Sequence, residues 1–284
     1  MSSTIGIIVS YHPEVDILHN VQEVLKEVSE VVIVDNASSE NSKKFLEALP
    51  KERVTIIFNT SNRGVAEGFN QGIRWGLERK YQYFVLFDQD SCPQRGMVEK
   101  LLEVSDALSK NNPLVLIGPH HEDYDFKTEV DRSEDIISTP LLITSGSLFT
   151  KPLIDAIGLY DERLFIDHVD HDYCLRLARR GGQIFRVNSA TLLHKFGKAE
   201  ARKFLGKKFL LQDYSAFRRY FMMRNRIVLY KRYGMFRGAW FRMDLRAAIV
   251  DFVKLILFEK NKVPKLRAVF KGIWDGLRWQ ESQS

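Results

Sequence analysis

The sequence has few cysteines and no long hydrophobic run. Its 284 residues contain two cysteines, Cys92 and Cys174, which cannot build a disulfide framework, and no CxxC pair or Cys/His cluster typical of zinc sites. The N-terminus lacks the basic segment and apolar run of a signal peptide. The longest apolar-rich stretch, residues 247–258, includes Asp251 and Lys254 and is far shorter than the roughly 20 residues of a membrane span. These absences predict a reduced, cytoplasmic protein without a transmembrane helix.

The glycines do not form the common nucleotide-binding motifs. Neither GxGxxG nor GxxxxGKS/T occurs, which argues against a dinucleotide-binding Rossmann domain and against a P-loop. The hydrophobic fraction of 45% and the charged fraction of 27% are ordinary for globular proteins, so the composition excludes a disordered chain.

Charge is distributed unevenly along the chain. Residues 1–194 hold 20 basic and 29 acidic residues, a net charge of −9, whereas residues 195–284 hold 22 and 7, a net charge of +15. An acidic body followed by a basic region indicates that the second part meets an anionic surface, either a membrane or a nucleic acid. We expect a first domain over residues 1–197 and a basic, amphipathic helical region over residues 198–284.

Short apolar runs alternate with helical patterns in the first half of the chain. The runs predict strands, and alternation of strands and helices predicts an α/β fold with a mostly parallel sheet flanked by helices. Residues 119–139 are polar and lack periodicity, which predicts a surface excursion. The expected strands lie at 5–9, 31–34, 54–58, 83–87, 114–117, 184–187 and 191–193.

Polar residues follow three of these strands: residues 10–13, 35–38 and 88–91. Ligands of open α/β sheets bind beyond the carboxyl ends of the strands, so these groups are candidates for one shared crevice. Each segment taken alone could equally be a turn or a helix cap, because Asp, Asn and Ser favour both.

The acidic pair Asp88 and Asp90 follows a strongly apolar strand. In an extended backbone two residues that are two positions apart point the same way, and two close carboxylates are costly unless a cation joins them. Their oxygens suit Mg²⁺ or Mn²⁺, which would keep open positions for phosphate oxygens. The alternative is a cap for the helix that begins near Gly96.

A second acidic cluster, Asp167, Asp170 and Asp172, opens a predicted helix, where the helix dipole favours carboxylates. A carboxylate at such a helix start is also a candidate general base. Residues 62–66 precede another helix, and Gly64 there allows a close backbone approach to an anion.

Taken together, these segments resemble glycosyltransferase family 2, the inverting transferases with the GT-A fold. Within the family, the chain resembles bacterial rhamnosyltransferases that use dTDP-L-rhamnose, through FDQDS, FIDHVDHDYCLR and RRYFMMRNRIVLYKRYG. The segments that carry the family resemblance span residues 5–197 in the family's order: IIVSYHP, VVIVDNASSE, NRGVAEGFNQGI, FDQDS, ITSGSLF, LFIDHVDHDYCLRLARRGG and LLHKFG.

The resemblance implies a role for each matching position. Asp35 would read the base of the donor. Asp88 and Asp90 match the DxD motif, with Asp90 the direct metal ligand and His194 completing the site. The donor-binding positions are Tyr11, Asp35, Asn36, Ser38, Asn62, Arg63, Gly64, Ala66, Asp88 and Gln89.

Asp170 matches the catalytic carboxylate of the family. Many relatives have Glu-Asp where this chain has Val169-Asp170, so Asp167 stays open as the alternative base. The implied reaction is metal-dependent transfer of L-rhamnose, with inversion, from dTDP-β-L-rhamnose to a saccharide or lipid-linked saccharide in bacterial cell-surface polysaccharide synthesis. The alternatives are another donor, such as UDP-galactose or UDP-N-acetylglucosamine, or a non-catalytic module that binds a nucleotide sugar or nucleic acid.

The basic region alternates cations with large apolar residues. Phe236, Trp240, Met243 and Ala247 share one helical face, and a basic amphipathic helix with aromatic residues suits a membrane interface. We therefore expect an anionic membrane surface rather than nucleic acid as the partner, with peripheral binding at the inner face of the cell membrane. The alternatives are packing of this helix on the catalytic domain and homo-oligomerisation.

Overall fold

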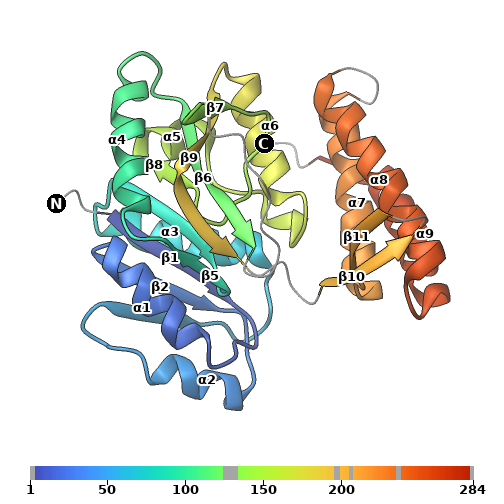
Figure 1. Cartoon of the computed structure of the whole chain (residues 1–284), viewed down its shortest axis with the longest axis horizontal. Helices are drawn as coiled ribbons and strands as arrows, with labels where there is room; N and C mark the ends of the chain where they lie inside the picture. The colour runs from blue at the N-terminus through green and yellow to red at the C-terminus, as the bar shows by residue number, and fades with distance from the viewer. Residues whose placement is uncertain (1–3, 124–133, 195–198, 205–206, 235–237, 282–284) are drawn as a thin grey trace. The chain divides into compact units, whose positions relative to one another are not determined.

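The computed structural model describes residues 4–123, 134–194, 199–204, 207–234 and 238–281 (Figure 1). The chain divides into two compact units: Met1–Phe165 with Val169–Lys195, and Ile166–His168 with Phe196–Ser284. We call them the first and the second unit. The domain boundary expected at 197/198 lies outside the described residues.

The described part of the first unit contains a nine-stranded sheet in the order β3-β2-β1-β4-β8-β6-β9-β5, with β7 paired to β9. Pairing among β1 to β4 is parallel, whereas β8 enters antiparallel between β4 and β6. The α/β fold is therefore confirmed, with a mixed sheet that is parallel among β1 to β4 and between β6 and β9. The strands are β1 (Thr4–Ser10), β2 (Glu30–Asp35), β3 (Val54–Phe58), β4 (Tyr83–Asp88), β5 (Ser91–Pro93), β6 (Val115–Asp123), β7 (Ile136–Ser138), β8 (Leu148–Thr150) and β9 (Gln183–His194).

Helices flank this sheet (Figure 1). The apolar strands β1, β2 and β4 are buried along nearly their whole length, as parallel strands covered on both faces must be. The helices are α1 (Ile17–Glu27), α2 (Glu40–Glu47), α3 (Val65–Glu78), α4 (Met97–Ser109), α5 (Lys151–Ile157) and α6 (Val169–Arg179), with a 3₁₀ turn at Glu162–Leu164.

A row of glycines brings α3 against the sheet. A Cβ added to Gly72 would lie 2.3 Å from the Ile7 side chain, and one added to Gly68 or Gly76 would lie 2.9 or 2.7 Å from its nearest neighbour. These glycines lower intrinsic helix propensity by about 1 kcal/mol each relative to alanine, but only a residue without a side chain fits the contact. The close contact places the N-terminus of α3 beside the carboxyl ends of β1 and β2.

Two strands are longer than expected. Strand β6 continues through His120 and His121 to Asp123, where the sequence predicted a surface excursion, and pairs with β9 across a register shift between Pro119 and His120. Strand β9 is one continuous element rather than two short ones. The polar residues of β6 can therefore form a strand, because β9, which is distant in the sequence, supplies their backbone hydrogen bonds.

After Ile166–His168, the described part of the second unit continues with a hairpin of β10 (Ala199–Phe204) and β11 (Lys207–Gln212), which the sequence analysis did not predict. Three helices follow: α7 (Ala216–Tyr233), α8 (Ala239–Phe258) and α9 (Lys262–Leu277) (Figure 1). Helices α7 and α9 pack closely because Gly272 and Gly276 lie against the α7 backbone.

The prediction of a shared apolar face on α8 is wrong. Trp240 is buried, whereas Met243 and Ala247 are exposed, and Phe236 lies outside the described residues. The buried side is instead rotated toward Trp240, Asp244 and Leu255. Among the residues that the structure describes, no helix is both long and apolar enough to cross a membrane.

Candidate active site

The carboxyl ends of β1, β2 and β4 meet at one edge of the sheet. Ser10 pairs in register with Asp35, and Val9 pairs with Asp88. The structure thus brings together the three strand ends that the sequence singled out. This is the edge at which open α/β sheets bind their ligands.

Asp35 organises the loops around it. Its side chain is fully buried and accepts hydrogen bonds from Ser10 Oγ at 3.1 Å, from Ser38 N at 2.9 Å and from Ser38 Oγ. Three of the roughly four acceptor positions of a carboxylate are thereby used within the protein. Asp35 holds the turn after β2 against β1, and its predicted contact with the base stays a prediction.

Gln89 joins the turn after β4 to the loop after β1. Its Oε1 accepts from Tyr11 N at 2.8 Å, and its backbone carbonyl accepts from Asn20 Nδ2 at 3.0 Å. His12 N donates to Ser38 Oγ at 2.8 Å, and His12 has a positive φ of 49°. The three loops therefore support one another and leave the Tyr11 ring half exposed at their rim.

The acidic pair lies at a strand end rather than within extended backbone. Strand β4 stops at Asp88, and Gln89 and Asp90 form a turn before β5. The two-residue alternation that the sequence argument used therefore does not apply to Asp90. Both carboxylates are partly exposed beyond the sheet, where a ligand can reach them.

Ser145 holds this acidic turn at both ends. Its Oγ accepts from Asp88 N at 3.1 Å and lies 2.7 Å from Ser91 Oγ, and both serines are buried. His121 Nε2 lies 2.8 Å from the Ser145 carbonyl oxygen. The sequence analysis assigned no role to Ser145, although it lies within the ITSGSLF segment. No local signal links it to Ser91, which is 54 residues away.

Helix α4 is capped by Glu27. The Glu27 carboxylate accepts from Gly96 N at 2.8 Å and from Val98 N at 3.0 Å. A glutamate from α1 therefore satisfies the amides that the alternative reading assigned to the acidic pair. This observation argues against a capping role for Asp88 and Asp90, and their ligand-binding role stays a prediction.

The backbone of His194 lies beside the acidic turn. Strand β9 pairs antiparallel with β5, and His194 is opposite Ser91, the residue after Asp90. The His194 side chain lies outside the described part of the chain. Its place in a metal site therefore stays a prediction, supported by this register.

The loop before α3 is fixed by amide side chains. Asn36 Nδ2 donates to the Gly64 carbonyl at 3.0 Å, and Asn62 Oδ1 accepts from Gly64 N at 2.9 Å. Gly64 has φ 88°, and a Cβ there would lie 2.5 Å from the Phe165 carbonyl oxygen. That oxygen accepts from Val65 N at 2.7 Å and from the next amide, of Ala66, at 3.4 Å, so protein groups already use part of the helix N-terminus.

Arg63 and Asn70 extend this arrangement. The Arg63 guanidinium pairs with Glu67 at 2.7 Å on the surface of α3. Asn70 donates to the Tyr160 carbonyl and accepts from Tyr160 N, both at 2.9 Å. The predicted donor loop is thus tied to residues 160–165, the segment that leads toward α6.

Asp170 and Asp172, in the first turn of α6, have different environments. Asp172 is fully buried and pairs with Arg176 at 2.9 Å, and Arg176 also donates to the carbonyls of Ile157 and Leu159. Asp170 is partly exposed and accepts a local hydrogen bond from His171 N at 2.9 Å. Asp172 is therefore held in a structural ion pair, and the role of the more exposed Asp170 as the base stays a prediction.

Asp167, the alternative base, belongs to the second unit. Its carboxylate accepts from Arg218 Nη2 at 2.9 Å and from Arg218 Nε at 3.1 and 3.2 Å. Both oxygens of the Asp167 carboxylate are therefore already engaged by a guanidinium within the protein. Phe165, Asp167 and His168 all have positive φ, so this turn carries backbone strain of the kind that gathers at functional sites.

Cys174 lies in the interior beneath the exposed side of α6. Burial raises the pKa of its thiol to about 12 and raises the pKa of the neighbouring Tyr160 hydroxyl well above its usual value. Neither group is ionised near neutral pH, which argues against a cysteine nucleophile here.

The chain belongs to glycosyl transferase family 2, whose members it matches over residues 7–180. It is a glycosyltransferase with the fold that the sequence resemblance implied. It is 27% identical over 300 residues to dTDP-rhamnosyl transferase RfbF of Shigella flexneri. The match covers 98% of this chain and 96% of that protein. It is also 25% identical over 225 residues to galactofuranosyltransferase GlfT1 of Mycolicibacterium smegmatis, across 72% and 74% of the two chains.

Solved structures support the same fold. GalNAc-T7, solved with UDP, GalNAc and Mn²⁺, superposes with a TM-score of 0.60 at 14% identity over 81% of this chain. TarS of S. aureus superposes with a TM-score of 0.55 at 13% identity over the whole of this chain. This chain spans about half of each of those proteins, 48% and 50%.

Proposed function

We propose that the protein transfers L-rhamnose from dTDP-β-L-rhamnose to a saccharide acceptor, with inversion at the anomeric carbon. The observation that carries the proposal is the meeting of the three strand ends, held by the hydrogen bonds from Ser10 to Asp35 and from Tyr11 to Gln89. The similarity to RfbF across nearly both whole chains supports rhamnose as the sugar.

The acidic turn fits a divalent cation. Asp88 and Asp90 offer carboxylate oxygens on a turn that Ser145 fixes, and the adjacent His194 would add an imidazole nitrogen. This donor set suits Mg²⁺ or Mn²⁺. A bound cation would supply charge neutralisation for the departing nucleoside diphosphate.

Asp170 is the general base in this proposal. Its carboxylate takes the proton from the acceptor hydroxyl, whose oxygen forms a bond to the anomeric carbon as the bond to the diphosphate oxygen breaks. Single displacement from the opposite face converts the β-linked donor into an α-rhamnoside. The partial exposure of Asp170, in contrast to the Arg218 contacts of Asp167, supports this assignment.

The acceptor is a lipid-linked saccharide in this proposal, and the enzyme works at the cytoplasmic face of the membrane. The support is the net charge of +15 over residues 195–284, which would attract an anionic leaflet by about 1 kcal/mol for each well-placed cation.

Release of free nucleoside diphosphate tests the proposed donor. The purified protein is incubated with dTDP-L-rhamnose, UDP-galactose or UDP-N-acetylglucosamine, each with Mn²⁺ or Mg²⁺ and each with a chelator. We expect dTDP release with the rhamnose donor, with water taking the place of the acceptor hydroxyl at the anomeric carbon, and loss of this release on chelation. Turnover of a UDP sugar alone would move the assignment to the alternative donor, and binding of a nucleotide sugar without turnover would favour a binding module.

A further inference from the structure

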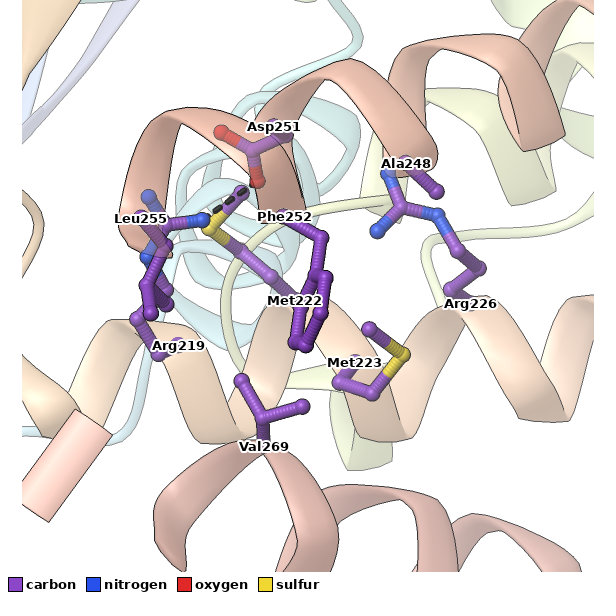
Figure 2. Close-up of a pocket in the computed structure, with 9 residues that line it drawn as sticks. All are labelled: Arg219, Met222, Met223, Arg226, Ala248, Asp251, Phe252, Leu255 and Val269. Atoms are coloured by element: carbon purple, nitrogen blue, oxygen red, sulfur yellow. Dashed lines mark hydrogen bonds and ion pairs between the residues drawn. The ribbon is translucent and has the colours of Figure 1, made fainter. Parts of the chain in front are cut away.

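Helix α8 carries its acidic residues on its buried side. Asp244 lies in the interior, and so does Glu259, the residue that ends the helix. Between them, Asp251 pairs with the Arg219 guanidinium of α7, as Figure 2 shows. The three carboxylates, spaced seven and eight residues apart, therefore mark one face of the helix.

These buried carboxylates have basic partners. Asp244 accepts from Arg226 Nε at 2.8 Å and from the Tyr230 hydroxyl at 2.6 Å. Glu259 accepts from Lys265 Nζ of α9 at 2.8 Å and from Arg219. Turning α8 over would expose these carboxylates and leave the buried Arg219 and Arg226 of α7 without counter-charges, so the pairs fix which side of α8 faces inward.

The outward side of α8 is apolar. A helix on the surface of a globular protein has the opposite arrangement, with its apolar stripe toward the interior. A contiguous exposed apolar patch of this kind marks an interaction surface. We call the following five side chains the α8 patch: Ile249, 57% exposed; Val250, 55%; Val253, 46%; Ile256, 37%; and Leu257, 51%.

Cations lie at both ends of the α8 patch. Arg242 and Arg246 are exposed in the turns before it, and Lys260 and Lys262 are exposed just beyond the end of the helix. Both acidic residues of α8 face inward in ion pairs. The patch therefore presents apolar side chains and positive charge together, which is the chemistry of an anionic lipid surface.

We propose that the α8 patch inserts into an anionic bilayer with the helix lying along the membrane surface. This inference rests on the proposed function, because it identifies how the enzyme reaches a lipid-linked acceptor. A second copy of the chain would set the same cations against one another, a like-charge contact that opposes pairing. Anionic headgroups complement those cations, and acyl chains take up the five apolar side chains.

Vesicle sedimentation of the full-length protein tests the inference. The vesicles are phosphatidylcholine alone or with phosphatidylglycerol, and binding is measured at about 0.01 M and about 1 M salt, where the Debye length falls from about 30 Å to about 3 Å. We expect binding to the anionic vesicles at low salt and a fraction that persists at high salt. Val253→Gln/Leu257→Gln is expected to lower the persistent binding by about 100-fold, because two apolar side chains no longer insert.

Matched variants separate the patch from general hydrophobicity. Val15→Gln/Ile136→Gln changes two exposed apolar residues of the first unit and is expected to leave vesicle binding unchanged. Arg242→Gln/Arg246→Gln is expected to weaken binding at low salt while the salt-resistant fraction remains. Equal high-salt binding by wild type and the Val253→Gln/Leu257→Gln variant would overturn the inference. So would a wild-type dimer that this variant converts to monomers.

A fluorescent label gives a second readout that does not need the double variant to fold. Cys92 and Cys174 are buried, so a cysteine introduced by Val253→Cys can be labelled selectively with an environment-sensitive dye. We expect its emission to shift to the blue on adding anionic vesicles, and the same dye at Val15→Cys to remain unchanged. An unshifted label at position 253 would contradict insertion.

Donor turnover without vesicles distinguishes this inference from the proposed function. The Val253→Gln/Leu257→Gln variant is expected to release dTDP from the rhamnose donor at the wild-type rate in solution. Vesicle binding without any dTDP release by the wild type would refute the proposed function alone. dTDP release without vesicle binding would refute only the α8 inference.

Discussion

The hydroxyl groups of Ser91 and Ser145 lie 2.7 Å apart in the interior of the first unit, and Ser145 also accepts the Asp88 amide. The buried Ser145 side chain thus contacts both ends of the acidic turn, at the Asp88 amide and the Ser91 hydroxyl. The loop that contributes Ser145 is itself fixed by Gly146 N, which donates to the Leu86 carbonyl at 2.6 Å. The geometry of the proposed metal site would therefore depend on Ser145, which is not among its proposed ligands.

Ser145→Ala is expected to weaken metal-dependent binding of dTDP by about tenfold, because a hydrogen bond that holds the turn is lost. Calorimetric titration of dTDP with Mn²⁺ measures the effect. Ser147→Ala is the matched control, since Ser147 is equally buried but donates to the Ile143 carbonyl instead. Similar losses in both variants would mean that Ser145 serves only the packing of its loop.

Much of the first unit could be predicted from the sequence. The apolar runs of β1, β2 and β4 are buried on both faces, so local pattern and final structure agree, and the polar residues after them reach one edge. The insertion of β8 and the length of β6 could not be predicted, because both depend on pairing with strands far along the chain. The cap that Glu27 supplies to α4 is hidden for the same reason.

The second unit was harder to predict because α8 buries its acidic residues and exposes apolar ones. A helical pattern indicates which residues share a face but not whether that face is buried. Asp244 looks like a solvent-exposed residue in the sequence, yet Arg226 and Tyr230 draw it into the interior. Trp240 is therefore buried, whereas Met243 is exposed.

Asp90→Ala is expected to weaken metal-dependent donor binding more than Asp88→Ala does. Asp88 ends a paired strand and its backbone amide is bonded to Ser145, whereas Asp90 lies in the turn next to the His194 register position. Titration of dTDP with Mn²⁺ compares the variants, with metal-free titrations as the control. Wild-type affinity in the Asp90 variant would remove its role as a ligand.

Asp244→Asn is expected to destabilise the second unit by about 3 kcal/mol at neutral pH, since the Arg226 charge stays buried without its counter-charge. Burial favours protonation of Asp244, but the hydrogen bond from His168 and the charge of Arg226 outweigh it and hold its pKa well below the usual value. The contribution is therefore present above the unfolded-state pKa of about 4 and is lost as the pH falls below it.

Urea unfolding followed by tryptophan emission measures this effect, because Trp240, Trp274 and Trp279 lie in the second unit. The difference between wild type and Asp244→Asn should shrink from pH 7 toward pH 3. Asp155→Asn, which removes the carboxylate of an exposed pair with Lys151, should change stability little at either pH. A pH-independent difference would show that the charge of Asp244 is not what stabilises the unit.

Asp170→Asn is expected to lower transfer by about 10²–10⁴-fold while dTDP affinity stays at the wild-type value, because a general base acts on the acceptor and not on the nucleotide. The partly exposed carboxylate at the start of α6 is replaced by an amide of the same shape that cannot take a proton. Asp167→Asn is the matched comparison, because Asp167 lies in the turn that precedes α6. This variant loses the ion pair between Asp167 and Arg218 and should keep most of the turnover. Turnover and calorimetric affinity are measured on the same preparations. If Asp170→Asn retains turnover and Asp167→Asn loses it, the base is Asp167. If Asp170→Asn also loses dTDP affinity, Asp170 has a donor-binding or structural role instead.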